Sequence, residues 1–330
     1  MAFKNILLFG AGGSRIGGYI LEALIADGSF NVTVLTRESS KATYPAAVRV
    51  KRVPDDFPHA ELVEALRGQN VVVSCIGYAA IGNEYKLVDA AIEASVQRFI
   101  PSEWGMDNAD VNNQKLNPIF KAKAKMAGYL QSKQSASFSW TAVATSIWLE
   151  WALDVNVLGI DPKAGKVQYW RDGTHAFSCT TLQYCGSAVA ALLKHPDTGR
   201  NQRVFLSPFE ASQRQIVAEL ESLMKVKFTT AHAEDEKIVK EAQRVWEEEK
   251  DLSAAYQLVT AGVLLPSYKS GFESSGKEPI LEKMIVMPKL TMSSVVAEVV
   301  GRRMGLRTVQ REESIEYWKY EENFDMKRQV

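Results

Sequence analysis

The feature that most constrains this chain is a glycine-rich turn near its start, enclosed between an apolar run and an amphipathic segment. The apolar run spans residues 6–9, the glycines stand at 10, 12, 13, 17 and 18, and the amphipathic segment spans 19–26. An unbroken apolar run is typical of a parallel strand buried on both faces, so the order is strand, glycine turn and helix. Residues without Cβ let the backbone approach a pyrophosphate, whose negative charge is favoured by the free N–H groups of a helix N-terminus. The turn therefore predicts a dinucleotide-binding site.

The spacing of these glycines is irregular. Gly10, Gly13 and Gly17 give G-x-x-G-x-x-x-G, whose last step is one residue longer than in the usual fingerprint. Such turns also occur where a chain merely packs tightly, but the preceding strand and following helix supply the context that the motif requires. We expect the cofactor to contact the turn and the first helical residues, which are Gly10, Gly12, Gly13, Ser14, Arg15, Ile16 and Gly17.

The composition excludes several other classes of protein. Lys plus Arg and Asp plus Glu each number 39 in 330 residues, so the net charge of zero favours neither nucleic acid nor an anionic membrane surface as a partner. The three cysteines show no metal-ligand spacing and predict neither a metal site nor a disulfide framework. The chain enters its first strand within a few residues and has no apolar run long enough to span a membrane. We therefore expect a cytoplasmic protein.

Strands and helices alternate through the first half of the chain. Apolar or β-branched runs predict strands at 30–36, 48–53, 70–77, 97–100 and 138–145, with helices at 60–67 and 85–95 between them. This alternation predicts an α/β fold, a doubly wound parallel sheet of the Rossmann-like, NAD(P)-binding type. We assign residues 1–155 to this cofactor domain, with a strand near 203–206 returning to it.

Residues 156–330 are less regular, and we assign them mainly to a smaller α/β lobe that binds substrate. Short strands are predicted at 166–170, 176–180 and 225–230, and helices at 186–193, 212–224, 234–251, 256–262 and 290–303. Residues 267–278 are rich in Ser, Gly and Lys, which indicates a flexible loop or lid.

The end of the second predicted strand indicates which nicotinamide cofactor fits. An acidic residue there would bind a ribose 2′-hydroxyl and repel a 2′-phosphate, but the first charged residue is Arg37. Its planar guanidinium suits phosphate, and Thr36 and Ser39 can add hydroxyl donors. Glu38 weakens this argument without reversing it. The sequence therefore predicts NADP(H), with a solvated turn arginine as the alternative.

The carboxyl ends of two later strands face the same crevice, because that is where ligands bind in a doubly wound sheet. These ends carry Ser74, Cys75, Ile76 and Gly77 after one strand, and Ser102 and Glu103 after the next. We expect all six to lie along the cofactor.

The run R-F-I-P-S-E-W-G at 98–105, taken with the glycine turn and the T-R-E-S run at 36–39, resembles one known family. It is similar to the isoflavone reductase-like and NmrA-like branch of the atypical short-chain dehydrogenases, closely over the first half and thinly over the second. The resemblance implies NADPH-dependent reduction of phenylpropanoid ethers, isoflavones and related compounds. It also implies an alternative, because NmrA-like members include redox-sensing regulators that bind the cofactor without turnover.

The chemistry depends on three lysines at 121, 123 and 125. Ordinary short-chain dehydrogenases use Tyr-x-x-x-Lys, but no tyrosine stands four residues before any of these lysines. The resemblance implies an F-x-x-K-x-K pattern that places the family's lysine at Lys123, as a general acid or base or as a ligand of the cofactor ribose. Helical spacing puts Lys121 and Lys125 on one face and Lys123 nearly opposite. The alternative is that all three are solvated.

Three apolar residues are predicted to contact the substrate: Trp104, Ile147 and Trp148. The resemblance implies an aromatic ring at position 148 beside the nicotinamide, where it would exclude water and stack on an aromatic substrate. Packing of a tryptophan-rich core segment is the alternative.

The sequence thus leaves three functions open. We favour an NADPH-dependent reductase of a small apolar metabolite, aromatic or an unsaturated carbonyl compound, with Lys123 as general acid or base. A cofactor-sensing regulator without turnover is the second hypothesis, and a non-redox isomerase or cyclase is the third. A small molecule is the expected partner, while a homodimer or a regulatory protein partner stays open.

Overall fold

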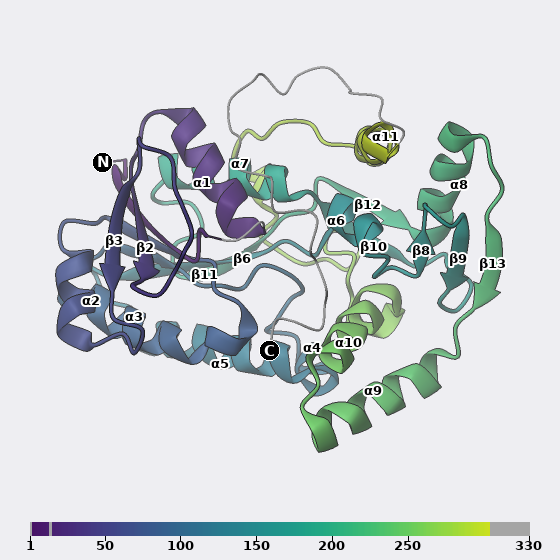
Figure 1. Ribbon diagram of the computed structural model, residues 1–330, viewed down its shortest axis with the longest axis horizontal. Coiled ribbons are helices and arrows are strands. Elements are labelled where there is room, and N and C mark those ends of the chain that lie inside the picture. Colours follow the sequence, from purple (N-terminus) through teal and green to yellow (C-terminus); the bar gives the residue numbers. More distant parts are fainter. Residues whose placement is uncertain (1, 13–14, 304–330) are drawn as a thin grey trace.

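The computed structural model describes residues 2–12 and 15–303 and is built around a parallel sheet of seven strands (Figure 1). The strands are β1 (Asn5–Phe9), β2 (Asn31–Arg37), β3 (Arg49–Val53), β4 (Val71–Ser74), β5 (Arg98–Ile100), β6 (Ser139–Ala144) and β11 (Gln202–Phe205). Their order across the sheet is β11-β6-β5-β4-β1-β2-β3, and every neighbouring pair is parallel. The predicted doubly wound, Rossmann-like fold is confirmed.

The strand order reverses between β1 and β4, which lie side by side although two strands separate them in the sequence. A reversal of this kind opens a crevice at the carboxyl ends of the strands, because the following connections leave in opposite directions. The glycine turn after β1 and the segment after β4 therefore meet at the predicted cofactor site.

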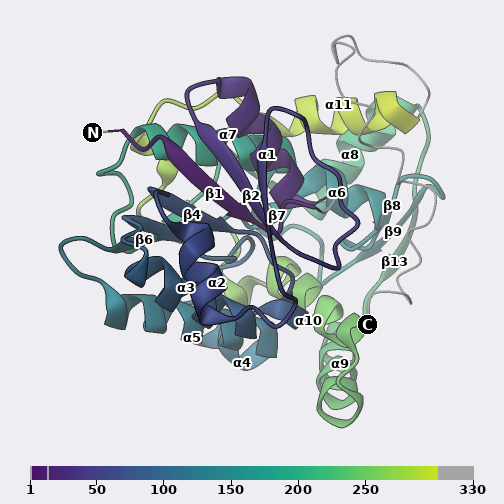
Figure 2. The ribbon, with the colours of Figure 1, turned by 60° about the vertical axis from the view of Figure 1, so that its left-hand side comes forward.

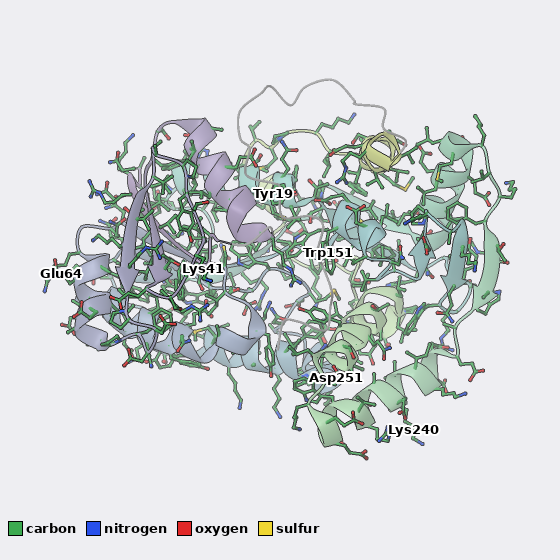
Figure 3. The ribbon with its side chains drawn as sticks, viewed as in Figure 1. Tyr19, Lys41, Glu64, Trp151, Lys240 and Asp251 are labelled. Carbon is green, nitrogen blue, oxygen red and sulfur yellow. The ribbon has the colours of Figure 1, made fainter. Side chains whose placement is uncertain are left out.

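Helices cover both faces of the sheet. Helices α1 (Ile16–Asp27) and α7 (Leu182–Lys194) lie on one face, and α2 (His59–Leu66), α3 (Gly82–Glu93) and α5 (Pro118–Lys133) on the other (Figure 1). Strand β1 serves both layers, because Ile6 and Leu8 point into the first and Leu7 into the second. The first layer is tight, since a Cβ on Gly186 of α7 would lie 2.5 Å from the carbonyl oxygen of Tyr19 in α1 (Figure 3).

The second part of the molecule holds two small sheets and most of the remaining helices. One sheet joins β7 (Ile147–Trp148), β10 (Ala176–Thr180) and β12 (Phe209–Ser212), and the other joins β8 (Ile160–Asp161), β9 (Lys166–Tyr169) and β13 (Thr229–His232). The helices are α4 (Val111–Leu116), α6 (Leu149–Asp154), α8 (Gln213–Met224), α9 (Asp235–Glu249), α10 (Leu252–Leu264) and α11 (Met292–Arg303), with 3₁₀ turns η1 (Tyr78–Ala80), η2 (Pro266–Tyr268) and η3 (Leu281–Lys283).

Each part has its own core, and Trp151 of α6 packs against both (Figure 3). Helix α9 extends away from the body of the molecule, as Figure 2 shows, and Ala242 is its buried residue. In the part of the chain that the structure describes, no helix has the length and apolarity to cross a lipid bilayer.

The structure corrects the predicted lid at 267–278. Phe272 is buried against Phe205 with ring centroids 4.9 Å apart, and its N–H donates to the Ser178 hydroxyl at 2.8 Å. The Ser270 hydroxyl donates to the carbonyl of Val263 at 2.6 Å. Ser, Gly and Lys favour loops in general, but in this segment the buried residues Ser270 and Phe272 bind the loop to the core.

Several boundaries also differ from the predictions. The strand predicted at 225–230 begins only at Thr229, because Lys225 ends α8 in the left-handed conformation. The strand predicted at 70–77 ends at Ser74, and α7 begins at Leu182, four residues before its predicted start. The ends of a short strand or helix cannot be predicted from hydrophobic periodicity alone when turn residues flank it.

Candidate active site

The glycine turn is shaped by close backbone contacts. Gly10 has φ +89°, and a Cβ there would lie 2.7 Å from the carbonyl carbon of Cys75. A Cβ on Gly17 would lie 2.3 Å from the carbonyl oxygen of Gly10. These glycines therefore let β1, β4 and α1 approach one another, while Gly13 and Ser14 lie outside the described residues.

The turn fits a pyrophosphate. Arg15 stands at the N-cap of α1 and its side chain makes no capping hydrogen bond, so the N-terminus of this 12-residue helix can present main-chain N–H groups to an anion. A Cβ on Gly12 would collide with Tyr44 and Ala42, so the loop after β2 lies against the turn. The residues present thus fit a dinucleotide.

The end of β2 carries the exposed guanidinium of Arg37, as predicted. Its side chain is 57% exposed and lies 4.0 Å from the carboxylate of Asp55. The main hydrogen-bond partner of Asp55 is Ser39. The main-chain N–H of Ser39 donates to the Asp55 carboxylate at 3.1 Å, and the Ser39 hydroxyl donates to the same carboxylate. These hydrogen bonds and the Arg37 charge hold the pKa of Asp55 below its ordinary value. Thr36 is buried, whereas Arg37, Glu38 and Ser39 are exposed, and Arg37 is the cation among these three.

Two residues at this edge escaped the sequence argument. Besides Asp55, Arg52 of β3 donates to the carbonyls of Arg37 at 3.2 Å and Ser40 at 2.8 Å. Arg52 lies on β3, which pairs with β2, and Asp55 lies in the turn after β3, so only the pairing of β2 with β3 reveals them.

The turns after β4 and β5 are joined by hydrogen bonds. The Ser102 hydroxyl donates to the carbonyl of Ile76 at 2.7 Å, and the Trp104 indole N–H donates to the carbonyl of Ser74 at 2.9 Å. Cys75 is half-buried and Gly77 is exposed at the start of η1. The two turns that the sequence assigns to the cofactor are therefore one structural unit.

Two of the predicted side chains in this unit point into the protein. Glu103 is 1% exposed and forms a buried ion pair with Arg203 of β11. Trp104 is 6% exposed and packs into the core beneath α1 and α7. Their roles toward a ligand stay predictions, and the main-chain carbonyl of Glu103 is the group that contacts the lysine helix.

Lys123 is the lysine of the three that turns toward this unit. Its Nζ donates to the carbonyl of Glu103 at 3.3 Å, and the side chain is half-buried, whereas Lys121 and Lys125 are exposed. The predicted arrangement on two faces of α5 is confirmed. Burial lowers the pKa of Lys123, and the nearby carboxylates of Glu103 and Glu84 oppose that shift.

Asn117 fixes the start of α5. Its side-chain oxygen accepts the N–H of Ile119 at 2.9 Å, and its amide donates to the carbonyl of Ala255 in α10 at 2.8 Å. One residue therefore caps the lysine helix and ties it to the second part of the molecule.

Glu84 is the functional candidate that the sequence argument missed. It lies in the first turn of α3, is fully buried, and accepts the N–H of Ser102 at 2.8 Å. Burial raises its pKa to about 7, while Ser74, Ser102 and Lys123 favour its charged form. An acidic residue in a first helical turn resembles an ordinary solvated one, so no sequence signal marks it.

Aromatic side chains follow β6 along the chain. Ile147 is buried, and Trp148 is half-buried with its ring edge-on to Trp151 at a centroid distance of 6.0 Å. Arg15 reaches across from the glycine turn, and its Nη1 lies 3.4 Å from the Tyr256 hydroxyl of α10. The predicted substrate contacts of Ile147 and Trp148 stay predictions.

A separate pocket of about 370 Å³ opens between α4, α5, α9 and α10. Its walls include Lys121 and Trp246 but not Lys123. It therefore lies on the other face of the lysine helix from the candidate site.

A glycine turn at a topological switch point, an arginine at the end of β2 and a half-buried lysine bonded to the turn after β5 define a Rossmann-type dinucleotide-binding protein. The NmrA-like family matches residues 3–261, and the chain belongs to that family.

Comparisons with individual proteins agree with this placement. The chain is 37% identical over 220 residues to the protein named oxidoreductase aprR of Aspergillus flavus, covering 66% of this chain and 73% of that protein. Among solved structures, an isoflavone reductase aligns with a TM-score of 0.71 at 20% identity, over 90% of this chain and 99% of the other. The leucoanthocyanidin reductase of Vitis vinifera, solved with NADPH, aligns with a TM-score of 0.70 at 14% identity, over 90% and 99%. At such identities the structural likeness establishes the fold.

Proposed function

We propose that this protein is an NADPH-dependent reductase of a small apolar metabolite, aromatic or an unsaturated carbonyl compound, with Lys123 as the general acid. The observation that carries the proposal is the placement of the Lys123 ammonium, half-buried and hydrogen-bonded to the carbonyl of Glu103 at 3.3 Å, beside the crevice at the carboxyl edge of the sheet. Named relatives such as the oxidoreductase aprR support it.

The cofactor would be held by groups from three strand ends. The N-terminus of α1 and the backbone at Gly10 and Gly12 would face the pyrophosphate, and Arg37 would pair with the 2′-phosphate. The leucoanthocyanidin reductase solved with NADPH supports the choice of cofactor. When bound, the nicotinamide supplies the hydride.

Lys123 would supply the proton. A carbonyl carbon that accepts a hydride leaves charge on its oxygen, and a protonated amine at hydrogen-bond distance can neutralise that oxygen. Burial lowers the pKa of Lys123, which makes its ammonium a stronger acid than an exposed lysine. The rings of Trp148 and Trp151 would exclude water and offer a surface for a planar substrate.

The same proposal assigns cofactor binding and substrate binding to different parts of the chain. Residues 1–155 together with β11 would bind the cofactor, and residues 156–330 would mainly shape the substrate pocket. The pairing of β11 with β6 supports this assignment.

A second candidate, a cofactor-sensing regulator without turnover, is favoured by one observation. The 3.4 Å contact from Arg15 to Tyr256 links the predicted cofactor turn to α10, so a change at the turn has a direct route to the second part of the molecule. A regulatory protein partner or a second copy of the chain would then bind with an affinity that depends on that change.

The test is a fluorescence titration with NADPH, NADP⁺ and NADH, followed by NADPH oxidation with a panel of aryl ketones, enones and quinones. Tight NADPH binding with turnover of at least one compound supports the reductase. A sensor must bind the oxidised and reduced cofactors with different free energies. Such a difference without any turnover favours the sensor, and no binding of either cofactor rejects both.

A further inference from the structure

Glu84 stands apart from the other acidic residues near the crevice, because it is fully buried and has no salt bridge among the described residues. It occupies the first turn of α3, and its Oε1 accepts the main-chain N–H of Ser102 at 2.8 Å. Its Oε2 meets no hydrogen-bond donor of the described residues at bonding distance, although the buried Ser74 hydroxyl lies close enough to favour the charged form. A buried carboxyl with an unmet oxygen is costly to retain for packing alone.

The hydrogen bonds around Glu84 lead directly to Lys123. Glu84 holds the N–H of Ser102, and the next residue, Glu103, presents its carbonyl to the Lys123 ammonium at 3.3 Å. The Ser102 hydroxyl fastens the same turn to the carbonyl of Ile76 at 2.7 Å. Glu84 of α3 therefore fixes the position of the Glu103 carbonyl, because a single peptide unit joins Ser102 to Glu103.

The charge of Glu84 also acts on Lys123. Among the described residues, the groups with an electrostatic interaction with Glu84 include Glu103, Lys123, Tyr85 and Cys75. Lys123 is the cation of these four, and the Glu84 charge opposes the effect of burial on the pKa of Lys123. In a buried site with little water, one such charge changes a neighbour's pKa substantially.

We propose that Glu84 is a positioning residue for Lys123, which holds the Ser102–Glu103 turn against the ammonium and supplies a buried charge that favours its protonated form. This rests on the proposed function only in that Lys123 is the group that does chemistry. Burial raises the pKa of Glu84 to about 7, so its charge changes within the neutral range, and the proposal therefore predicts that the two groups titrate as a coupled pair.

Glu84→Gln tests the proposal, because it removes the charge while keeping an oxygen that can accept the N–H of Ser102. Glu150→Gln is the matched control. Glu150 also has a pKa raised to about 7 by burial and also accepts a main-chain N–H, that of Leu182 at 2.6 Å, but it has no part in the electrostatics of Lys123. Circular dichroism establishes that each variant is folded.

The measurement is the rate at which acetic anhydride acetylates Lys123 as a function of pH, followed by mass spectrometry of the peptide that contains it. The midpoint of this curve of acetylation rate against pH reports the pKa of Lys123. We expect it to fall by roughly one pH unit in Glu84→Gln, which is about a tenfold lower proton affinity of Lys123. In Glu150→Gln it should stay at the wild-type value. Equal midpoints in all three proteins would overturn the proposal. So would an equal fall in both variants, since that would mark a general effect of losing a buried carboxyl.

The wild-type curve decides the matter if Glu84→Gln does not fold. A coupled pair gives a two-step curve with an inflection near the pKa of Glu84, and a single simple titration of Lys123 rejects the coupling. The labelling needs neither cofactor nor substrate. If Glu84 and Lys123 titrate together but the protein turns over no substrate, this proposal stands and the proposed function is rejected. If the protein turns over a substrate but the two groups titrate independently, the proposed function stands and this proposal is rejected.

Discussion

The Nζ of Lys123 donates a hydrogen bond to the main-chain carbonyl of Glu103 at 3.3 Å, while the carboxylate of the same glutamate forms a buried ion pair with Arg203. One residue thus contacts the lysine helix with its backbone and an outer strand of the sheet with its side chain. The carbonyl cannot be lost by substitution, so the position of Lys123 is fixed by groups that are themselves held in the core.

Replacing Lys123 by alanine is expected to lower kcat by about 100- to 10,000-fold, the range for a lost general acid, with NADPH affinity little changed. Steady-state kinetics together with a fluorescence titration measure both quantities. Lys121→Ala, on the exposed face of the same helix, should retain wild-type kinetics. Equal losses in the two variants would show that Lys123 has no special role.

Replacing Arg37 by alanine is expected to weaken NADPH binding by roughly 10- to 100-fold, because a charge-assisted hydrogen bond to phosphate is lost. NADH, which lacks the 2′-phosphate, should bind equally to wild type and variant. Arg49→Ala, an exposed arginine on the neighbouring β3, is the control. If Arg37→Ala weakens both cofactors to the same extent, the assignment of the 2′-phosphate to Arg37 is wrong.

Replacing Gly17 by alanine is expected to destabilise the fold by about 1–3 kcal/mol, because the new Cβ would lie 2.3 Å from the backbone oxygen of Gly10. NADPH binding should weaken as well, since the turn must shift. Gly128→Ala is the matched control: Gly128 lies in the interior of α5, where a Cβ meets nothing within 4 Å. It should raise the free energy of unfolding by about 0.5–1 kcal/mol. Urea denaturation measures both, and an unchanged Gly17→Ala would contradict the close approach.

Replacing Arg203 by methionine is expected to lower the free energy of unfolding by about 3–5 kcal/mol, because Glu103 is left as an uncompensated buried charge. The Arg203 side chain is 10% exposed and also lies 3.5 Å from Asp107. The control is Arg244→Ala, which breaks an exposed ion pair with Glu241 on α9 and should cost less than about 1 kcal/mol. Similar losses in the two variants, measured by urea denaturation, would show that the buried pair contributes no more than a surface one.

The free energy of unfolding should fall as the pH rises from about 4.5 to about 7. Glu84 and Glu150 each have a pKa of about 7 when folded, against an ordinary 4.5, because burial disfavours the charged form. The folded state then binds more protons than the unfolded state in this interval, so raising the pH favours unfolding, by about 3 kcal/mol for each group.

Urea denaturation at a series of pH values tests this. The double variant Glu84→Gln, Glu150→Gln should show a flatter dependence on pH, while the exposed Glu38→Gln should follow the wild type. A double variant with the wild-type slope would mean that neither carboxyl is protonated in the folded state near neutral pH.

The fold and part of the site were predictable because their signals are local. Apolar runs and the glycine turn fix the order of strands and helices, and helical periodicity alone separates Lys123 from Lys121 and Lys125. Residues 269–278 form a loop, as the composition of 267–278 predicted, but Phe272 and Ser270 hold this loop to the core, which no local composition indicates.

The sequence by itself determined the doubly wound sheet, the position of the glycine turn and the face of α5 that carries Lys123, since neighbours within a few residues dictate each of these. Only the tertiary structure decided that Arg203 neutralises Glu103, and that Glu84 lies buried against Ser102, eighteen residues further along the chain. The physical reason is that the charge state and burial of a side chain depend on what the sheet order brings beside it. Adjacent strands come from distant parts of the chain, so no local pattern encodes those contacts.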